Sequence, residues 1–242
     1  MLKLKILERK PCMITHLNNF RDITKLTNFL KFFLYASLVL NFFALLSDYL
    51  EYSALINAQN SAYASAESLH KAVELNSSRQ AYVGILQMIT ALLTSILFLR
   101  WIYFSNANAH ALKANGMQFT PLWSIVWYFV PIAHLWKPYQ AMNEIWKCSE
   151  NPHQWKSIKT DSILHWWWSL WILSFLADHL LIRYALDAHD IQTSIHFAIA
   201  NSISDFMHIP LSAVAILLIT RISSMQMSQQ VRQAGGYTMI SL

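Results

Sequence analysis

Long apolar stretches separated by polar connections are the main pattern of this chain. A helix that crosses a hydrocarbon layer needs about 20 mostly apolar residues, because each residue rises about 1.5 Å. Four stretches meet this requirement, at residues 29–50, 82–104, 162–184 and 192–222. The last is longer than one bilayer needs, and Pro210 is its natural place for a kink. The pattern predicts an all-α fold, a polytopic transmembrane helical bundle with four firm spans.

A fifth apolar stretch, residues 119–136, is bracketed by prolines and allows two interpretations. Thr120 followed by Pro121 favours a helix start, whereas Pro131 interrupts the run and Pro138 follows it. The stretch is therefore either a kinked fifth spanning element or a re-entrant element. Non-helical backbone at membrane depth is tolerated only where protein or a wet cavity covers it.

The distribution of Lys and Arg residues distinguishes between these two topologies. With a re-entrant stretch, about fifteen of the 18 Lys and Arg residues fall on one side, and only Lys71, Arg79 and Arg183 lie outside. With a spanning stretch, the split becomes roughly ten to eight. We therefore favour four spans plus a re-entrant or interfacial element, with the N-terminus in the cytoplasm.

The remaining segments are polar connections and tails. Residues 1–28 form a basic cytoplasmic tail without a signal-peptide cleavage pattern. Residues 51–81 contain no Gly or Pro, so we expect a largely helical outer loop. Residues 223–242 are expected to form a polar cytoplasmic tail, in which Gly235 and Gly236 indicate flexible chain.

Composition and charge narrow the class of protein. Hydrophobic residues make up 55% of the chain and charged residues 13%, where a soluble domain has about 25% charged residues. The net charge of +5 does not predict nucleic-acid binding, because the basic residues flank apolar runs instead of forming one stripe. Cys12 and Cys148 are expected to be unpaired thiols on the reducing, cytoplasmic side.

The run FTPLWSIVWYFVPIAHLWKPYQAMNEIW, from Phe119 to Trp146, is a long and specific motif. Together with Trp-Trp-x-Leu-Trp at Trp167–Trp171 and Arg-Ile-x-x-x-Gln at Arg221–Gln226, it resembles the bacterial membrane-protein family called domain of unknown function 4328. The resemblance extends over about residues 30 to 230. It implies a helical protein of the bacterial inner membrane, and it implies no activity, because the family has none established.

All ten tryptophans lie between Trp101 and Trp171. They form either an anchoring belt at one interface or an aromatic-walled pocket for a lipid or another amphiphile. Glu144 is expected either to pair with Lys137 or Lys147 or to lie on a solvated helix face. The residues of the hypothetical pocket are Trp123, Trp127, Pro131, Trp136, Pro138, Tyr139, Glu144 and Trp146.

Ionisable residues inside a bilayer are functional candidates by default. Those within the last two spans are Asp178, His179, Arg183, Asp205 and His208. A carboxylate near a histidine could relay protons or bind a cation. The structural alternative pairs Asp178 with Arg183 or a neighbouring helix, and Asp205 with Asn201 or a facing Ser or Thr.

The pattern leaves three functions open. The first is binding of a lipid, an amphiphile or a partner membrane protein through the aromatic and proline-rich element; membrane lipids, another membrane protein or a second copy are the expected partners. The second is a b-type haem protein, with candidate ligands His165, His179, His196 and His208, although His196 and His208 are about 120° out of phase. The third is a small proton- or ion-coupled transporter or channel subunit. Neither a cofactor nor an enzyme activity is expected, because no catalytic motif is present.

Overall fold

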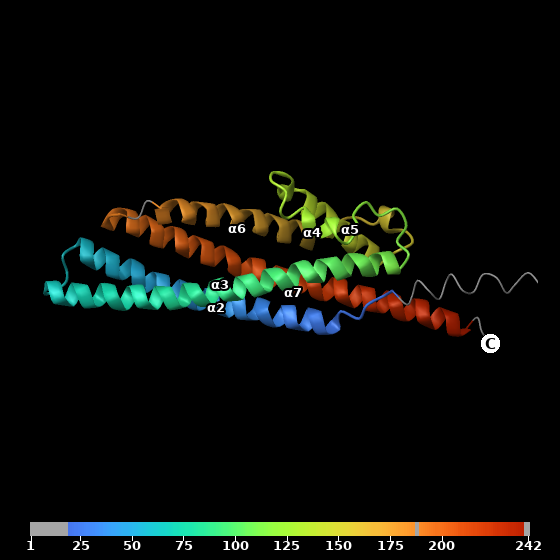
Figure 1. The fold of residues 1–242 in the computed structure, drawn as a ribbon, viewed down its shortest axis with the longest axis horizontal. Helices are drawn as coiled ribbons and strands as arrows, with labels where there is room; N and C mark the ends of the chain where they lie inside the picture. The colour runs from blue at the N-terminus through green and yellow to red at the C-terminus, as the bar shows by residue number, and fades with distance from the viewer. Residues whose placement is uncertain (1–18, 187–188, 240–242) are drawn as a thin grey trace, which may run out of the picture. The chain divides into compact units, whose positions relative to one another are not determined.

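The structure is a computed structural model that describes residues 19–186 and 189–239 (Figure 1). These residues form helices joined by turns, and no strand occurs among them. The long helices are α2 (Thr24–Gln59), α3 (Ala66–Ala111), α6 (Ser162–Leu186) and α7 (Ile191–Met239). Shorter elements between α3 and α6 are α4 (Trp123–Val126), η1 (Ala133–Leu135), α5 (Lys137–Glu150) and η2 (Trp155–Ser157).

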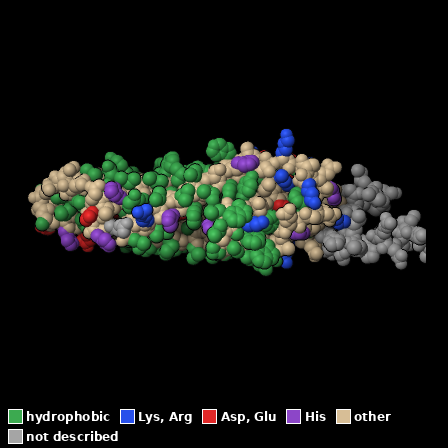
Figure 2. Space-filling model, turned by 90° about the horizontal axis from the view of Figure 1, so that it is seen from above, with side chains coloured by type: hydrophobic (Ala, Val, Ile, Leu, Met, Phe, Trp, Pro, Cys, Tyr) green, Lys and Arg blue, Asp and Glu red, His purple; other side chains and the backbone are tan. Residues whose placement is uncertain are grey.

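Four helices in this part of the chain are long and apolar enough to cross a membrane, and they are α2, α3, α6 and α7. Each contains one of the four stretches expected from hydropathy, so the predicted fold class is confirmed. The helices extend beyond those stretches: α2 continues to Gln59, and α3 already begins at Ala66. Figure 2 shows hydrophobic side chains covering a wide part of the face that is seen, as expected for a surface in contact with lipid.

Residues 119–136 contain no long helix. The four residues of α4 and the three of η1 are the regular elements of this stretch, and turns connect them. Residues 119–136 therefore do not form a fifth spanning helix. The re-entrant or interfacial placement of this stretch stays a prediction. We call residues 119–136 the apolar loop.

The chain after residue 222 differs from the expected flexible tail. Residues 223–239 continue α7, which also runs through Pro210 without ending there. Gln226 is buried with only 1% of its side chain exposed, so this part of α7 belongs to a packed core. Residues 1–18 of the predicted basic tail, including Cys12, lie outside the described residues.

The described residues divide into two compact units. Unit 1 consists of residues 19–30, 96–164 and 217–239, and unit 2 of residues 31–95, 165–186 and 189–216. Unit 1 carries ten Lys and Arg residues against four Asp and Glu residues. Unit 2 carries four Lys and Arg residues against seven Asp and Glu residues. Each unit therefore has its own charge character, basic in unit 1 and acidic in unit 2.

The core of unit 1 is held by buried polar side chains as well as apolar ones. The indole Nε1 of the fully buried Trp101 donates to the hydroxyls of Thr27 and Ser223, both at 3.2 Å. Asn108 pairs with the backbone of Arg21 through two hydrogen bonds of 2.9 Å. These bonds fix the start of α2 against α3 and α7, because buried polar groups are stable only when they have partners.

Unit 2 is built from the remaining parts of α2, α3, α6 and α7. The turn between α2 and α3 ends in a reciprocal cap, in which Ser65 and Ser68 each accept a hydrogen bond from the other's backbone N–H. Asp190 caps α7 by accepting a 2.7 Å bond from the backbone N–H of Thr193, and this bond lowers the pKa of the Asp190 carboxyl. The ends of these helices are therefore set by local side-chain chemistry.

Candidate functional site

The apolar loop is anchored at its first residues by side chains from α3 and α5. Glu144 of α5 accepts hydrogen bonds from the backbone N–H groups of Gln118, at 2.8 Å, and Phe119, at 3.0 Å. The ring nitrogen Nε2 of His110 lies 3.1 Å from the carbonyl oxygen of Phe119. Thr120 then accepts a 3.4 Å bond from the backbone N–H of Trp123, the first residue of the short helix α4.

The middle of the apolar loop contains a strained backbone turn. Ile132 has φ 66° and ψ −52°, and the N–H of Ala133 donates to the carbonyl oxygen of Pro131 at 2.7 Å. This is the geometry of the classic γ-turn, which is rare, and a positive φ is especially unusual for a β-branched residue. Such strain persists only where the surrounding structure imposes it, and it is concentrated at functional sites.

The surface of the apolar loop is rich in exposed hydrophobic side chains. Phe129 and Ile132 are 72% and 70% exposed. The other large apolar side chains exposed on this segment are Leu122, Trp123, Leu135 and Trp136. Exposed apolar groups gathered on one short segment indicate contact with a membrane or another protein. Figure 1 shows the segment around α4 looping out beside α5.

The residues expected to line an aromatic pocket differ in their exposure. Trp123 and Trp127 contact each other with ring centroids 5.0 Å apart, and Lys137 lies 5.7 Å from the Trp127 ring centroid. Pro131 and Trp136 are exposed on the apolar loop, whereas Tyr139 is partly buried. In contrast, Pro138, Glu144 and Trp146 are buried in unit 1.

Glu144 and Cys148 are both buried side chains of α5. Glu144 is only 5% exposed, so the interpretation of a solvated helix face is wrong. Its hydrogen bonds go to the backbone at residues 118 and 119 instead of to a lysine. Cys148 is a buried free thiol, and burial, together with the nearby Glu144 carboxylate, raises the pKa of the Cys148 thiol. This thiol is therefore a packing residue.

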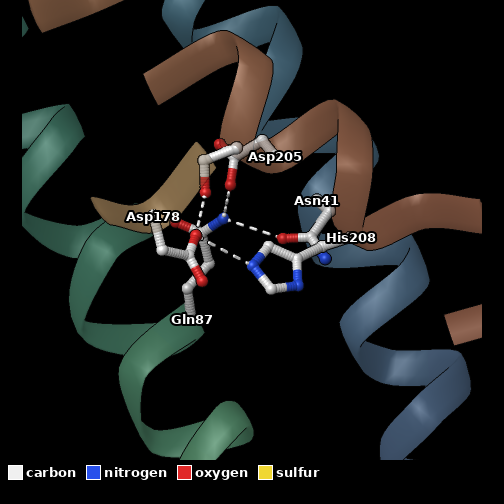
Figure 3. A network of polar contacts seen from close by, with 6 residues as sticks. Asn41, Gln87, Asp178, Asp205 and His208 are labelled. Atoms are coloured by element: carbon white, nitrogen blue, oxygen red, sulfur yellow. Dashed lines mark hydrogen bonds and ion pairs between the residues drawn. The ribbon is translucent and has the colours of Figure 1, made fainter. Parts of the chain in front are cut away.

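A second candidate site is a polar network inside unit 2. The side-chain nitrogen of Gln87, on α3, donates to Asp205 of α7 at 2.7 Å and lies 3.0 Å from the amide oxygen of Asn41 on α2. Figure 3 shows these side chains pointing toward one another. Polar side chains from three membrane-spanning helices thus converge on one amide.

The α6 side of this network is centred on Asp178. Its Oδ1 lies 3.2 Å from Nε2 of His208 and also accepts a hydrogen bond from the hydroxyl of Ser204, both on α7 (Figure 3). Asp178 therefore pairs with the neighbouring helix, one of the structural alternatives expected from the sequence. Asp205 and His208, three residues apart on α7, bring the two halves of the network together.

Asp48, at the end of the first predicted span, is a member of the network that the sequence did not single out. Its side chain is fully buried, and Oδ1 accepts bonds from Asn201 at 2.7 Å and Gln80 at 3.3 Å. Asn201 thus donates a hydrogen bond to Asp48. Asp205 accepts its hydrogen bond from Gln87 instead of from Asn201.

A seven-residue spacing is the signal that could have revealed these residues. Asn41 and Asp48 are seven apart, as are Gln80 and Gln87. Residues seven apart lie within about 20° of the same helix face. Asn201 and His208 repeat this spacing on α7. Each helix therefore presents a polar stripe inside an otherwise apolar run.

Other predicted site residues lie apart from this network. His179 and Arg183 are exposed on α6, outside the hydrogen bonds that join Asp178 to α7. Of the candidate haem ligands, His208 contacts Asp178, and His196 lies 3.2 Å from Gln192. The haem hypothesis stays a prediction for these two and for His165 and His179. Within residues 19–186 and 189–239, no group of three or more His, Cys, Asp or Glu side chains is arranged to hold a metal ion.

Comparisons with known proteins place this architecture in a family. A family model described as "Domain of unknown function (DUF4328)" matches residues 64–224. Neither the comparison with curated proteins nor the comparison with solved structures found a match. The matched range begins before α3 and ends within α7, so it contains the whole motif from Phe119 to Trp146 but not α2. Because the match covers more than half of the chain, this protein belongs to the DUF4328 family.

Proposed function

We propose that this membrane protein binds lipid through the apolar loop, whose exposed side chains insert among acyl chains at the cytoplasmic face of a bacterial inner membrane. The observation that carries the proposal is the exposure of six large hydrophobic side chains on one anchored segment. The anchoring by Glu144 and His110 matters, because a fixed loop loses little entropy when it enters the lipid.

The free energy of transferring the exposed side chains from water to lipid favours lipid as the environment of this loop. Full burial of one large apolar side chain contributes about 1.5–3 kcal/mol. The six side chains of the loop are roughly half exposed, so their transfer from water to lipid is worth on the order of 5 kcal/mol. This amount is comparable to the whole stability of a small domain. A loop of this kind is stable where acyl chains cover it.

The charge around the loop supports a lipid headgroup as the polar part of the contact. Lys137 follows the loop directly, and its Nζ lies 5.7 Å from the ring centroids of both Phe119 and Trp127. Unit 1 as a whole is basic. A basic residue near an anionic bilayer surface gains about 1 kcal/mol, and an ammonium group between aromatic rings suits the headgroup level.

The test uses a fluorescent label on the loop of the full chain, reconstituted in vesicles of phosphatidylethanolamine and phosphatidylglycerol. Phe129→Cys is labelled in a Cys12→Ser background, where the buried Cys148 stays unreactive. His153→Cys, on the exposed connection after α5, is the matched control.

We expect brominated lipids to quench the label at position 129 strongly and iodide to quench it weakly, with the reverse at position 153. Quenching at position 129 by iodide alone would contradict the proposal. Protection from both quenchers would also contradict it, because the loop would then be covered by protein.

A further inference from the structure

Two buried carboxyl groups from different helices belong to the polar network inside unit 2. The side chain of Asp48 on α2 is 0% exposed, and that of Asp205 on α7 is 6% exposed. Asn201, which donates to Asp48 at 2.7 Å, lies one helical turn before Asp205 on α7, so the two acids belong to the same face of this helix contact. Ionised carboxylates only accept hydrogen bonds, so two of them in contact repel each other and form no bond.

The hydrogen-bond donors around the pair serve only one oxygen of each acid. Oδ1 of Asp48 accepts from Asn201 and Gln80, and Oδ1 of Asp205 accepts from Gln87. Oδ2 of Asp48 and Oδ2 of Asp205 are buried, and neither receives a hydrogen bond from any side chain or backbone group described. Each acid therefore has one buried oxygen without a donor.

The donors that reach the pair are neutral: they are the amides of Asn201, Gln80 and Gln87, and the Ser202 hydroxyl also lies near Asp48. An amide can stabilise one buried negative charge but supplies no positive charge to balance a second one. Two full negative charges enclosed by membrane-spanning helices would be strongly unfavourable. One proton shared by the pair removes one charge and supplies the missing donor in a single step.

We propose that Asp48 and Asp205 form a proton-binding site, in which one proton is held between their two Oδ2 atoms at neutral pH. Binding forms one O–H bond to a proton delivered from water, and no other bond changes. The pair then carries a single negative charge, which the amides of Asn201, Gln80 and Gln87 stabilise.

The titratable groups around the pair come from each helix of unit 2. Glu51 lies near Asp48 on α2, and Arg79 of α3 donates to the hydroxyl and the carbonyl of Ser47. On the other side, His208 of α7 lies three residues from Asp205 and contacts Asp178 of α6 (Figure 3).

The position of His208 gives the pair an exchange partner. An imidazole takes up and releases protons near neutral pH. His208 lies one helical turn after Asp205 on α7, and its Nε2 is 3.2 Å from Asp178, so we infer that it is the group that exchanges protons with Asp205. This site does not involve the apolar loop, so it stands or falls independently of lipid binding.

The test is infrared spectroscopy of the full chain in lipid vesicles at pH 7. A protonated carboxyl group shows a C=O stretching band that an ionised carboxylate lacks. We expect a band equivalent to one carboxylic acid per chain in the unaltered protein, which shifts in deuterated water. Absence of any such band would overturn the proposal without the need for a variant.

Variants assign the band to its residues. We expect Asp48→Asn and Asp205→Asn each to abolish it, because the new amide N–H supplies the missing donor and leaves the remaining acid ionised. Glu51→Gln and Asp178→Asn are the matched controls, and the band should persist in both. A band that disappears with Glu51→Gln, or that persists in both Asp48→Asn and Asp205→Asn, contradicts the proposal.

Sodium distinguishes a proton from a metal cation in the same place. At constant pH, exchange of potassium chloride for sodium chloride should leave the band unchanged. Loss of the band in sodium would show that the pair binds a cation in place of the proton, and this result would also overturn the proposal.

Discussion

Glu144 connects the α5 core of unit 1 to the apolar loop through two backbone hydrogen bonds. Both carboxylate oxygens are used, one for the N–H of Gln118 and one for the N–H of Phe119. Hydrogen bonds from two backbone N–H groups to a buried carboxylate are charge-assisted and therefore stronger than neutral ones. The residue is thus a structural anchor that places the first turn of the loop.

We expect Glu144→Gln to lower the free energy of unfolding by about 1–3 kcal/mol, because glutamine offers one acceptor oxygen and turns its NH₂ group toward a backbone donor. Thermal unfolding in mild detergent measures the change. Glu150→Gln, an exposed position at the end of the same helix, is the control and should have little effect. Equal stability of the two variants would show that the anchor is unimportant.

The role of Glu144 was not visible in the sequence for a definite reason. Its partners lie 25 and 26 residues earlier in the chain, and they are backbone groups, which carry no residue-type signal. Asp48 is a more extreme case, since its bond to Asn201 joins residues 153 positions apart. Such contacts depend on how helices pair, and helix pairing is set by many weak packing interactions.

At the level of elements, the long helices were predictable because hydropathy is a local property. Asp178 and Asp205 were also recognised individually, since an acid inside an apolar run is conspicuous. In contrast, Pro131 and Pro138 indicate that the apolar loop is irregular, but they do not determine its backbone conformation. The γ-turn at Ile132 has no sequence signature, because β-branched residues normally avoid that conformation.

The C-terminal part of α7 shows how one side chain can join several elements. The Gln226 amide nitrogen donates to the carbonyl of Ser105 on α3 and the hydroxyl of Ser149 on α5, at 2.8 and 2.9 Å. Its amide oxygen lies 3.4 Å from the side-chain nitrogen of Asn108. The glutamine of the Arg-Ile-x-x-x-Gln motif therefore connects three helices through hydrogen bonds.

Gln226→Met should destabilise the protein by about 1–3 kcal/mol, because it keeps the side-chain volume but leaves buried polar groups on α3 and α5 without a partner. The midpoint of chemical denaturation in detergent gives the measurement. The neighbouring exposed residue Ser224 provides the comparison through Ser224→Ala, which should be nearly neutral. A neutral Gln226→Met would mean that water replaces the lost amide.

For the whole molecule, the four candidate spans and the basic character of unit 1 make a prediction about topology. Four crossings would place residues 60–65 and 189–190 on one side of the membrane and residues 112–161 on the other. Because basic segments remain in the cytoplasm, residues 112–161 should be cytoplasmic.

Cysteine labelling in intact cells measures this topology. In a Cys12→Ser background, Ser61→Cys should react with a membrane-impermeant maleimide, and His153→Cys should react only after the membrane is permeabilised. The opposite pattern would reverse the orientation. Labelling of both positions from outside would contradict the four-span arrangement.

The range of the family match contains only part of the polar network. Residues 64–224 include Asp178, Asp205 and His208, whereas Asn41 and Asp48 on α2 precede it. The polar network therefore combines side chains from inside and outside the matched range. The resemblance seen in the sequence reached back to about residue 30, and the structure shows why α2 belongs with the rest: its polar groups have partners on α3 and α7.

The pairing of α2 with α3 bears on how the chain is inserted during synthesis. Arg79 donates to Ser47, and Gln80 donates to both Asp48 and Glu51, so several polar groups of α2 already have partners on α3. The Ser65–Ser68 cap closes the connection between them. A nascent chain can thus leave the translocon as a preassembled helical hairpin, which shields its charges from the lipid before α6 and α7 have been made.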